Sequence, residues 1–422
     1  MTFCFCREYN GNTYTIKLLD FFERIVSMKG FYFKGMAANI KKDGKKDLGL
    51  IFSVRPASAA ALFTTNKVVA APVILGRDRI RSGLCQAVVV NSGNANCFTG
   101  EHGLKDAKET AALAAKALQI PETLVHVMST GVIGAPLPMA RFKEAMPELT
   151  RRLTDDEEAE KDHLKDFAEA ILTTDTCVKM VSKKGSVKSH EYSIVGIAKG
   201  SGMIRPDMAT MLAFICTDLD ISSTLLKFSL KRACDRSFNR ISVDGDTSTN
   251  DTVLAMANGM SGAAIEDSDD AIEFQNLLDE VMVELSRMIV RDGEGATKLV
   301  KLVVNGAFSA EDAYKAAEAI SHSNLVKTAI YGEDPNWGRI TAAAGRSGAM
   351  VDQEKMDLSF GDIFLLKKGV WQGIDAEKKA ADVMKKNELE IVLDLNLGNY
   401  SDFYIFCDFS ENYVKINADY RS

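Results

Sequence analysis

Short apolar runs typical of β-strands alternate along this chain with charged, amphipathic runs typical of α-helices, and this alternation limits the possible folds most. The strand-like runs cover residues 48–54, 87–91, 192–198, 210–218, 299–304, 325–331, 389–395 and 402–409. The helix-like runs cover residues 103–118, 139–151, 155–172, 222–236, 271–290, 310–321 and 376–386. Strands interleaved with single helices favour an α/β protein whose sheets form layers covered by helices.

Composition narrows the class of function. The 422 residues suffice for two domains or one large two-part body, and 46% of them are hydrophobic, which is ordinary for a globular protein. A net charge of -7 without a basic patch disfavours nucleic-acid binding, so we expect small-molecule substrates. No apolar run is long enough to cross a membrane. The scattered cysteines indicate reduced thiols in the cytoplasm, and the histidines form no cluster, so we expect no metal.

A glycine- and proline-rich segment, residues 199–209, precedes the apolar strand that begins at Thr210. Such a segment can hold the peptide bond between Ala209 and Thr210 in a strained, exposed geometry. Cleavage there would give Thr210 a free amine with a pKa of roughly 7.7 to 8.0, able to serve as the base for its own hydroxyl. The alternative is an ordinary loop before a strand, which spacing alone favours.

Three other segments contain residue types suited to acyl transfer. Thr130 and Gly131 follow an apolar strand, where a hydroxyl and a backbone N–H can stabilise an oxyanion, although a plain turn also explains them. Lys199 ends another strand and can meet a substrate carboxylate, although lysine is usually solvated. Glu294 lies between two glycines and suits a substrate ammonium group, although turn chemistry also accounts for it.

Residues 199–212 match the pattern K-G-x-G-M-x-x-P-x-x-A-T-M-L at every specified position. That pattern is typical of the self-processing site in the ornithine acetyltransferase family of arginine biosynthesis, whose members are also called glutamate N-acetyltransferases. The chain therefore resembles this family. Further segments resemble the family in the family's order: 91–96, 129–134, 173–176, 242–252, 292–298, 332–339 and 417–422. Together they cover about residues 29 to 422.

The resemblance implies a layered α-β-β-α sandwich built from both halves of a chain that cuts itself. The halves would be residues 29–209 and 210–422, which remain associated, two of each, as a heterotetramer. Residues 1–28 do not resemble the family, and we interpret them as an extension or a start-site artefact.

The resemblance also implies an activity and its residues. Acetyl would pass from N-acetylornithine to glutamate through an acetyl-Thr210 intermediate, with no bound cofactor and with acetyl-CoA as a further donor in some members. The implied residues are Thr210 as nucleophile and base, Thr130 and Gly131 as oxyanion hole, and Thr173 (favoured over Thr174), Lys199, Thr210, Glu294, Asn417 and Ser422 as substrate contacts. The alternatives are a self-processed hydrolase or aminopeptidase of the N-terminal-nucleophile class, and a non-catalytic binding protein.

Overall fold

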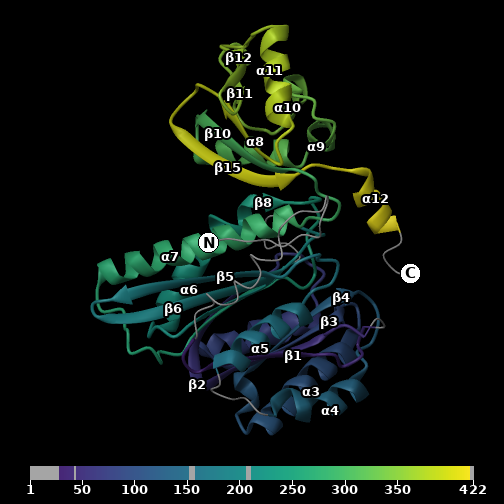
Figure 1. Ribbon diagram of the computed structural model, residues 1–422, viewed down its shortest axis with the longest axis vertical. Coiled ribbons are helices and arrows are strands. Elements are labelled where there is room, and N and C mark those ends of the chain that lie inside the picture. The colour runs from purple at the N-terminus through teal and green to yellow at the C-terminus, as the bar shows by residue number, and fades with distance from the viewer. Residues whose placement is uncertain (1–27, 42–43, 152–156, 206–210, 419–422) are drawn as a thin grey trace. The chain divides into compact units, whose positions relative to one another are not determined.

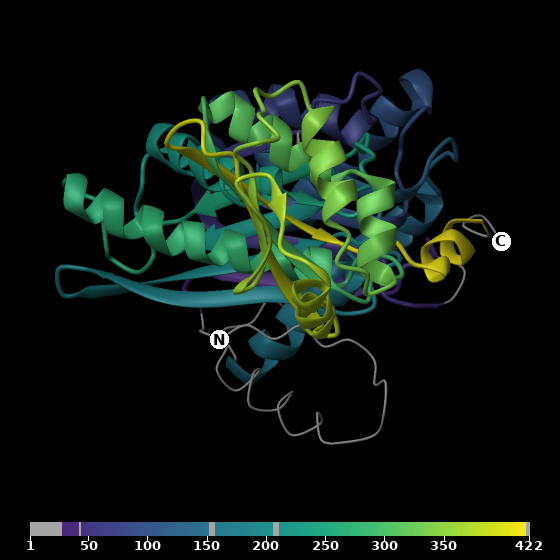
Figure 2. The same ribbon diagram turned by 90° about the horizontal axis from the view of Figure 1, so that it is seen from above.

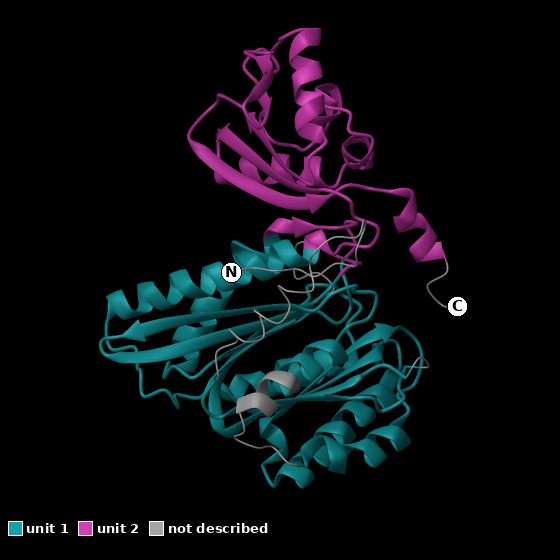
Figure 3. Cartoon of the chain, in the orientation of Figure 1, with its two compact units in different colours: residues 1–200, 207–239, 247–289 teal, residues 201–206, 240–246, 290–422 magenta. Residues whose placement is uncertain are grey.

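A computed structural model describes residues 28–41, 44–151, 157–205 and 211–418. The chain forms two compact units, each built around one β-sheet (Figure 3). Unit 1 comprises residues 1–200, 207–239 and 247–289, and unit 2 comprises residues 201–206, 240–246 and 290–422. The chain therefore passes between the units several times, first at the peptide bond that follows Gly200.

The sheet of unit 1 has the strand order β4-β3-β2-β9-β7-β6-β5, and β1 pairs with β2. Its strands are β1 (Phe31–Met36), β2 (Leu48–Phe63), β3 (Leu84–Asn94), β4 (Val125–Val132), β5 (Lys179–Val187), β6 (His190–Lys199), β7 (Leu212–Thr217) and β9 (Thr252–Ala257). Neighbours β3 and β4 run parallel, as do β7 and β9, whereas β6 is antiparallel to both β5 and β7. The central strands are buried along nearly their whole length, as expected for a sheet with helices on both faces.

Helices cover both faces of this sheet (Figure 1). Those of unit 1 are α2 (Ala71–Arg79), α3 (Gly100–Leu118), α4 (Met139–Thr150), α5 (Glu157–Ala170), α6 (Ser223–Asp235) and α7 (Ser268–Arg291), with 3₁₀ turns at Ile80–Ser82, Glu122–Leu124 and Phe238–Arg240. Alternate residues of β2, β3 and β4 face α3 and α4, and the opposite face contacts α5. There Phe167 of α5 makes edge-to-face contacts with Phe33 and Phe214.

The β5–β6 hairpin projects from this sheet and runs beside α7 (Figures 1 and 2). Gly196 in β6 lets the two elements approach closely, because a Cβ there would come within 2.7 Å of the Val281 and Leu285 side chains of α7. The far end of the hairpin is exposed. Its near end brings Lys179 and Lys199 to one edge of the sheet, where Lys179 pairs with Ala198.

The sheet of unit 2 has the order β13-β12-β11-β14-β10-β15-β8. Its strands are β8 (Ile241–Ser242), β10 (Leu299–Ala307), β11 (Asp357–Phe360), β12 (Ile363–Lys367), β13 (Val370–Trp371), β14 (Glu388–Asp394) and β15 (Tyr400–Cys407). Its helices are α8 (Ala310–Ser321), α9 (Asn324–Tyr331), α10 (Trp337–Gly345), α11 (Ile374–Met384) and α12 (Glu411–Ala418). Helices α8, α10 and α11 cover one face of the sheet and bury the second large core.

The expected mixed α/β fold with two sheets and flanking helices is confirmed. One predicted element is wrong: residues 325–331 were expected to form a strand but lie in helix α9. Ser323 caps that helix, and Val326 and Ile330 are buried one helical turn apart while Leu325 is 61% exposed. No helix within the described ranges is long and apolar enough to cross a membrane. Of the segment 1–28, expected as an extension or artefact, residues 1–27 lie outside the described residues.

Candidate functional site

The predicted oxyanion pair, Thr130 and Gly131, lies near the end of β4, where β4 pairs with β3. Thr130 is buried, and Gly131 has a left-handed φ of 131°. A Cβ at Gly131 would come within 2.4 Å of the Gly93 carbonyl carbon, so only glycine fits this close approach of two backbones. The Asn250 side chain donates to the carbonyls of Ala95 and Ser129, at 2.7 and 2.8 Å, and thereby fixes the backbone before Thr130.

Lys199 brings three predicted site residues together. It ends β6, is only 2% exposed, and donates from Nζ to the Thr173 hydroxyl at 2.7 Å and the Thr130 hydroxyl at 3.4 Å. The predicted alternative, a solvated lysine, is therefore wrong. A buried ammonium that contacts two hydroxyls at a strand end is suited to binding a carboxylate.

Asp175, which the sequence analysis did not single out, is the carboxylate beside Lys199. Its side chain is fully buried and accepts from Lys179 Nζ at 2.8 Å and from the Gly200 backbone N–H at 2.6 Å. Burial alone would raise the pKa of Asp175, but the charges of Lys179 and Lys199 hold that pKa well below its usual value. Asp175 is therefore ionised at neutral pH.

A second buried carboxylate, Asp251, holds the residue that follows Thr210. Its Oδ1 accepts from the Met211 backbone N–H at 3.0 Å, and Thr252 N–H donates to the Met211 carbonyl at 3.2 Å. Its other oxygen, Oδ2, has no hydrogen-bond partner among the described residues. Burial raises the pKa of Asp251 well above its usual value, although the Met211 N–H, the nearby Ser248 and Thr64 side chains and the charge of Lys199 oppose the shift.

Two further predicted residues, Glu294 and Asn417, meet within unit 2. Asn417 Nδ2 donates to Glu294 Oε2 at 2.8 Å, and Glu294 N–H donates to the Ser201 carbonyl at 2.8 Å. Glu294 is 8% exposed, whereas Asn417 is exposed on α12. Gly202 leaves space for the Glu294 carboxylate, since a Cβ there would lie 2.5 Å from Oε2.

The structure thus assembles Thr130, Gly131, Thr173 and Lys199 in unit 1 and Glu294 with Asn417 in unit 2. The predicted residues Ala209, Thr210 and Ser422 lie outside the described ranges. The sequence analysis missed Asp175, Lys179 and Asp251 as parts of the site. The available signal was weak: Asp175 and Asp251 lie within the segments 173–176 and 242–252, where carboxylates also serve as turn residues.

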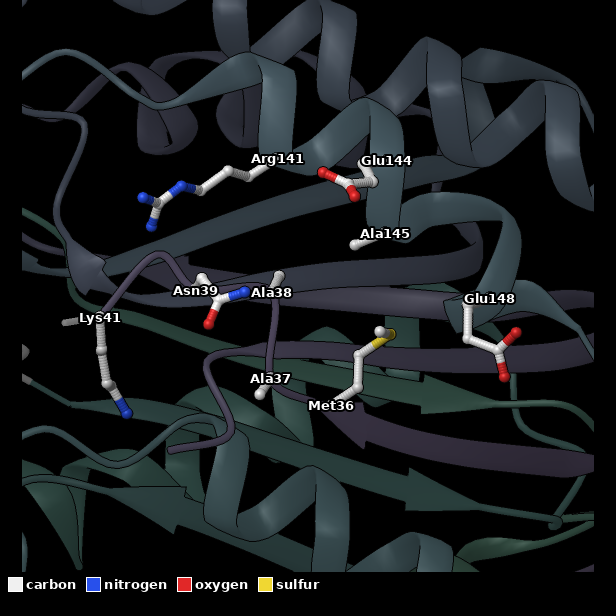
Figure 4. A pocket seen from close by; sticks show the side chains of 9 residues that line it. All are labelled: Met36, Ala37, Ala38, Asn39, Lys41, Arg141, Glu144, Ala145 and Glu148. Carbon is white, nitrogen blue, oxygen red and sulfur yellow. The ribbon is translucent and has the colours of Figure 1, made fainter. Parts of the chain in front are cut away.

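A cavity of about 570 Å³ elsewhere in unit 1 contains none of the predicted site residues (Figure 4). Arg141 and Glu144 of α4 form one wall, and Asn39 and Lys41 after β1 form the other. Its lining includes no serine, threonine or cysteine that could act as a nucleophile. Across the described part of the chain, no three histidine, cysteine, aspartate or glutamate side chains are grouped to hold a metal ion.

Comparisons with known proteins place this geometry in context. Residues 32–422 match the ArgJ family. The Geobacter sulfurreducens arginine biosynthesis bifunctional protein ArgJ is 49% identical over 399 residues, which cover 94% of this chain and 100% of that protein. The Methanocaldococcus jannaschii glutamate N-acetyltransferase is 45% identical over 399 residues, covering 92% and 97% of the two chains. A crystal structure of ArgJ from Bacillus halodurans covers 49% of this chain and 97% of its own, with 40% identity and a TM-score of 0.47.

Proposed function

This chain belongs to the ArgJ family, and from that premise we propose that it is an acyltransferase of arginine biosynthesis that moves acetyl from N-acetylornithine to glutamate. The products are ornithine and N-acetylglutamate. The observation that carries the proposal is the convergence of Lys199, Thr173 and Thr130 at the edge of one sheet. Thr130 lies on β4, Lys199 ends β6 and Thr173 lies in the loop before β5, yet the three bring a buried cation and two hydroxyls to one place, as recognition of an amino-acid substrate requires.

Thr210 is the proposed nucleophile, first in self-cleavage and then in acetyl transfer. Its hydroxyl attacks the Ala209 carbonyl carbon, the peptide C–N bond breaks, and the nitrogen takes the hydroxyl proton to become the α-amine of Thr210. Water then hydrolyses the ester that joins the two chains. The new amine has a pKa near working pH and removes the hydroxyl proton in later turnovers.

In each half of the exchange, a carbonyl carbon becomes tetrahedral and its oxygen becomes negative. Thr210 Oγ attacks the acetyl carbonyl of N-acetylornithine, the amide C–N bond breaks, and ornithine leaves with the hydroxyl proton on its nitrogen. The glutamate amine then attacks the acetyl ester, the acetyl C–Oγ bond breaks, and the proton that the amine loses returns to Thr210 Oγ as N-acetylglutamate leaves. The Thr130 hydroxyl and the Gly131 N–H are the proposed donors to the oxyanion, and each such donor contributes about 2.7 to 4 kcal/mol to transition-state stability.

The charged ends of the amino acid have proposed partners of opposite sign. Lys199, assisted by the Thr173 hydroxyl, is suited to the substrate carboxylate, because its ammonium is buried and already directed by hydrogen bonds. Glu294, held by Asn417, is suited to the substrate ammonium. Ser422 is a further proposed contact from the chain's end.

Three finer features belong to the same proposal. Acetyl-CoA serves as a second donor to glutamate, which agrees with the word bifunctional in the relatives' names. The reaction takes place in the cytoplasm, which the buried cysteine thiols of the described residues support. The mature protein assembles as a heterotetramer of two 29–209 chains and two 210–422 chains.

The intact mass of the purified protein tests the nucleophile. We expect two fragments that join at Ala209 and Thr210 in the parent, and one uncut chain in Thr210→Ala. Incubation of the cut protein with N-acetylornithine should then add one acetyl group to the 210–422 fragment. A soluble parent that stays uncut would contradict the assignment of Thr210.

Donor and acceptor assays separate transfer from its rivals. We expect parallel double-reciprocal lines for N-acetylornithine and glutamate, because an acetyl-enzyme separates the two half-reactions. Acetyl-CoA replaces N-acetylornithine in a second assay. A hydrolase of the same class would release acetate whether or not glutamate is present. A binding protein would neither transfer acetyl nor release acetate.

A further inference from the structure

We propose that Asp175 is a positioning residue for the acetyl exchange, which holds Lys199 and Thr173 in the arrangement that binds the amino-acid substrate. The inference rests on the proposed function. It adds a residue that contacts no substrate and acts through two residues that do. The buried Lys179 is its counter-ion.

Among the described residues, Asp175 contacts the predicted site residues Thr173 and Lys199, the Gly200 backbone and the first residue of β5. Oδ2 accepts from the Thr173 backbone N–H at 3.0 Å and lies 3.8 Å from Lys199 Nζ. Oδ1 accepts from the Gly200 N–H at 2.6 Å and from Lys179 Nζ at 2.8 Å. One carboxylate therefore fixes the loop that carries Thr173, the backbone after Lys199, and the first residue of β5.

The balance of charge explains why a carboxylate is needed at this place. The side chains of Lys179 and Lys199 are 0% and 3% exposed, and Asp175 is fully buried between them. Two buried ammonium groups repel each other and lose hydration, and a shared carboxylate offsets both effects. Asp175 bonds Lys179 at 2.8 Å and approaches Lys199 to 3.8 Å, so its charge acts on both ammonium groups, while its closest ion pair is with Lys179.

The Lys199 ammonium lies beside one member of the predicted oxyanion pair, Thr130. Lys199 Nζ contacts the Thr173 and Thr130 hydroxyls, and the Thr173 hydroxyl also donates to Asp175 Oδ2 at 3.5 Å. Without the Asp175 charge, Lys199 and Lys179 would separate and the Thr173 loop would lose its anchor. The substrate would then bind less tightly, while the nucleophile and the oxyanion donors would stay in place.

The test is the steady-state kinetics of Asp175→Asn beside Lys183→Met and the double variant Asp175→Asn/Lys179→Met. Asparagine keeps the size of the side chain and one accepting oxygen but removes its charge. The double variant removes both members of the Asp175–Lys179 pair, so that Lys179 does not stay buried without its counter-ion if the single variant fails to fold. Lys183 lies on β5 too, but it pairs with Glu280 at the surface, so Lys183→Met controls for loss of a lysine from this strand.

We expect the KM for glutamate and for N-acetylornithine to rise about 10- to 100-fold in both variants that lack the Asp175 carboxylate, because small displacements of a binding group cost that much. We expect kcat to fall less than KM rises, and Lys183→Met to match the parent. A purely structural role would lower the yield of folded enzyme and leave KM unchanged. Unchanged KM values in a folded Asp175→Asn variant would overturn the role of Asp175 but leave the proposed function standing. A parent enzyme that shows no acetyl exchange would contradict both the proposed function and the role of Asp175.

Discussion

At the scale of single residues, the carboxyl group of Asp251 leads to a prediction about stability. It is fully buried, its Oδ2 has no partner among the described residues, and burial raises its pKa well above its usual value. A raised native pKa means that the folded state holds the proton more tightly than the unfolded state does. Stability therefore falls as the pH rises from about 3.9, the pKa of an unfolded aspartate, through the native pKa.

We therefore expect Asp251→Asn to raise the free energy of unfolding at pH 8 by about 1 kcal/mol and to leave it unchanged near pH 3. The measurement is denaturant unfolding in a Thr210→Ala background, which keeps processing out of the comparison. Asp175→Asn is the control of opposite sign: burial alone would raise the pKa of Asp175, but the charges of Lys179 and Lys199 hold it below its usual value, so loss of that carboxylate should lower stability at pH 8. A loss of stability in Asp251→Asn, like that expected for the control, would contradict this account.

The residues of the site differ in how far the sequence could predict them. Thr130 and Lys199 have residue types suited to acyl transfer, but an ordinary turn and a solvated strand end explained them as well, so it was the resemblance that singled them out together with Thr173. Asp175 could not be predicted as a site residue, because its role depends on Gly200, which lies 25 positions away, and on the pairing of β5 with β6. A buried ion pair is fixed by tertiary register, and no local pattern in the sequence reports that register.

At the scale of elements, helix α9 shows where periodicity is ambiguous. Its eight residues are mostly apolar, and a run this short fits a buried strand as well as a buried helix. Longer runs with clear periodicity, such as α3 and α7, were predicted as helices. Val326 and Ile330, four positions apart, are buried in the core while Thr328 between them is exposed. This spacing fits one face of a helix, because in a strand Thr328 would lie on the same face as both.

Two substitutions in α9 test this arrangement. Ile330→Ala removes a side chain that is 2% exposed and should lower the free energy of unfolding by about 2 to 5 kcal/mol. Leu325→Ala removes a side chain of equal size that is 61% exposed and should change it by less than about 0.5 kcal/mol. Denaturant unfolding measures both. Equal losses at the two positions would argue against the helix.

At the scale of the whole molecule, the proposed cut divides the sheet of unit 1 between two chains. Strands β2 and β6 precede the cut and β7 and β9 follow it, yet β6 pairs with β7 and β2 pairs with β9. The order β2-β9-β7-β6 places both strands of the later chain between strands of the earlier one. The two chains therefore share one set of backbone hydrogen bonds and one apolar core.

From this arrangement we expect the cleaved chains to stay together in native gel filtration and to unfold in one transition. They should separate only in denaturant, since each fragment alone would expose the unpaired edges of β6 or β7. Residues 29–209 expressed alone should be insoluble, and coexpression with residues 210–422 should restore soluble protein. Fragments that separate without denaturant, or a soluble 29–209 chain, would show that the later strands are not needed to complete the sheet.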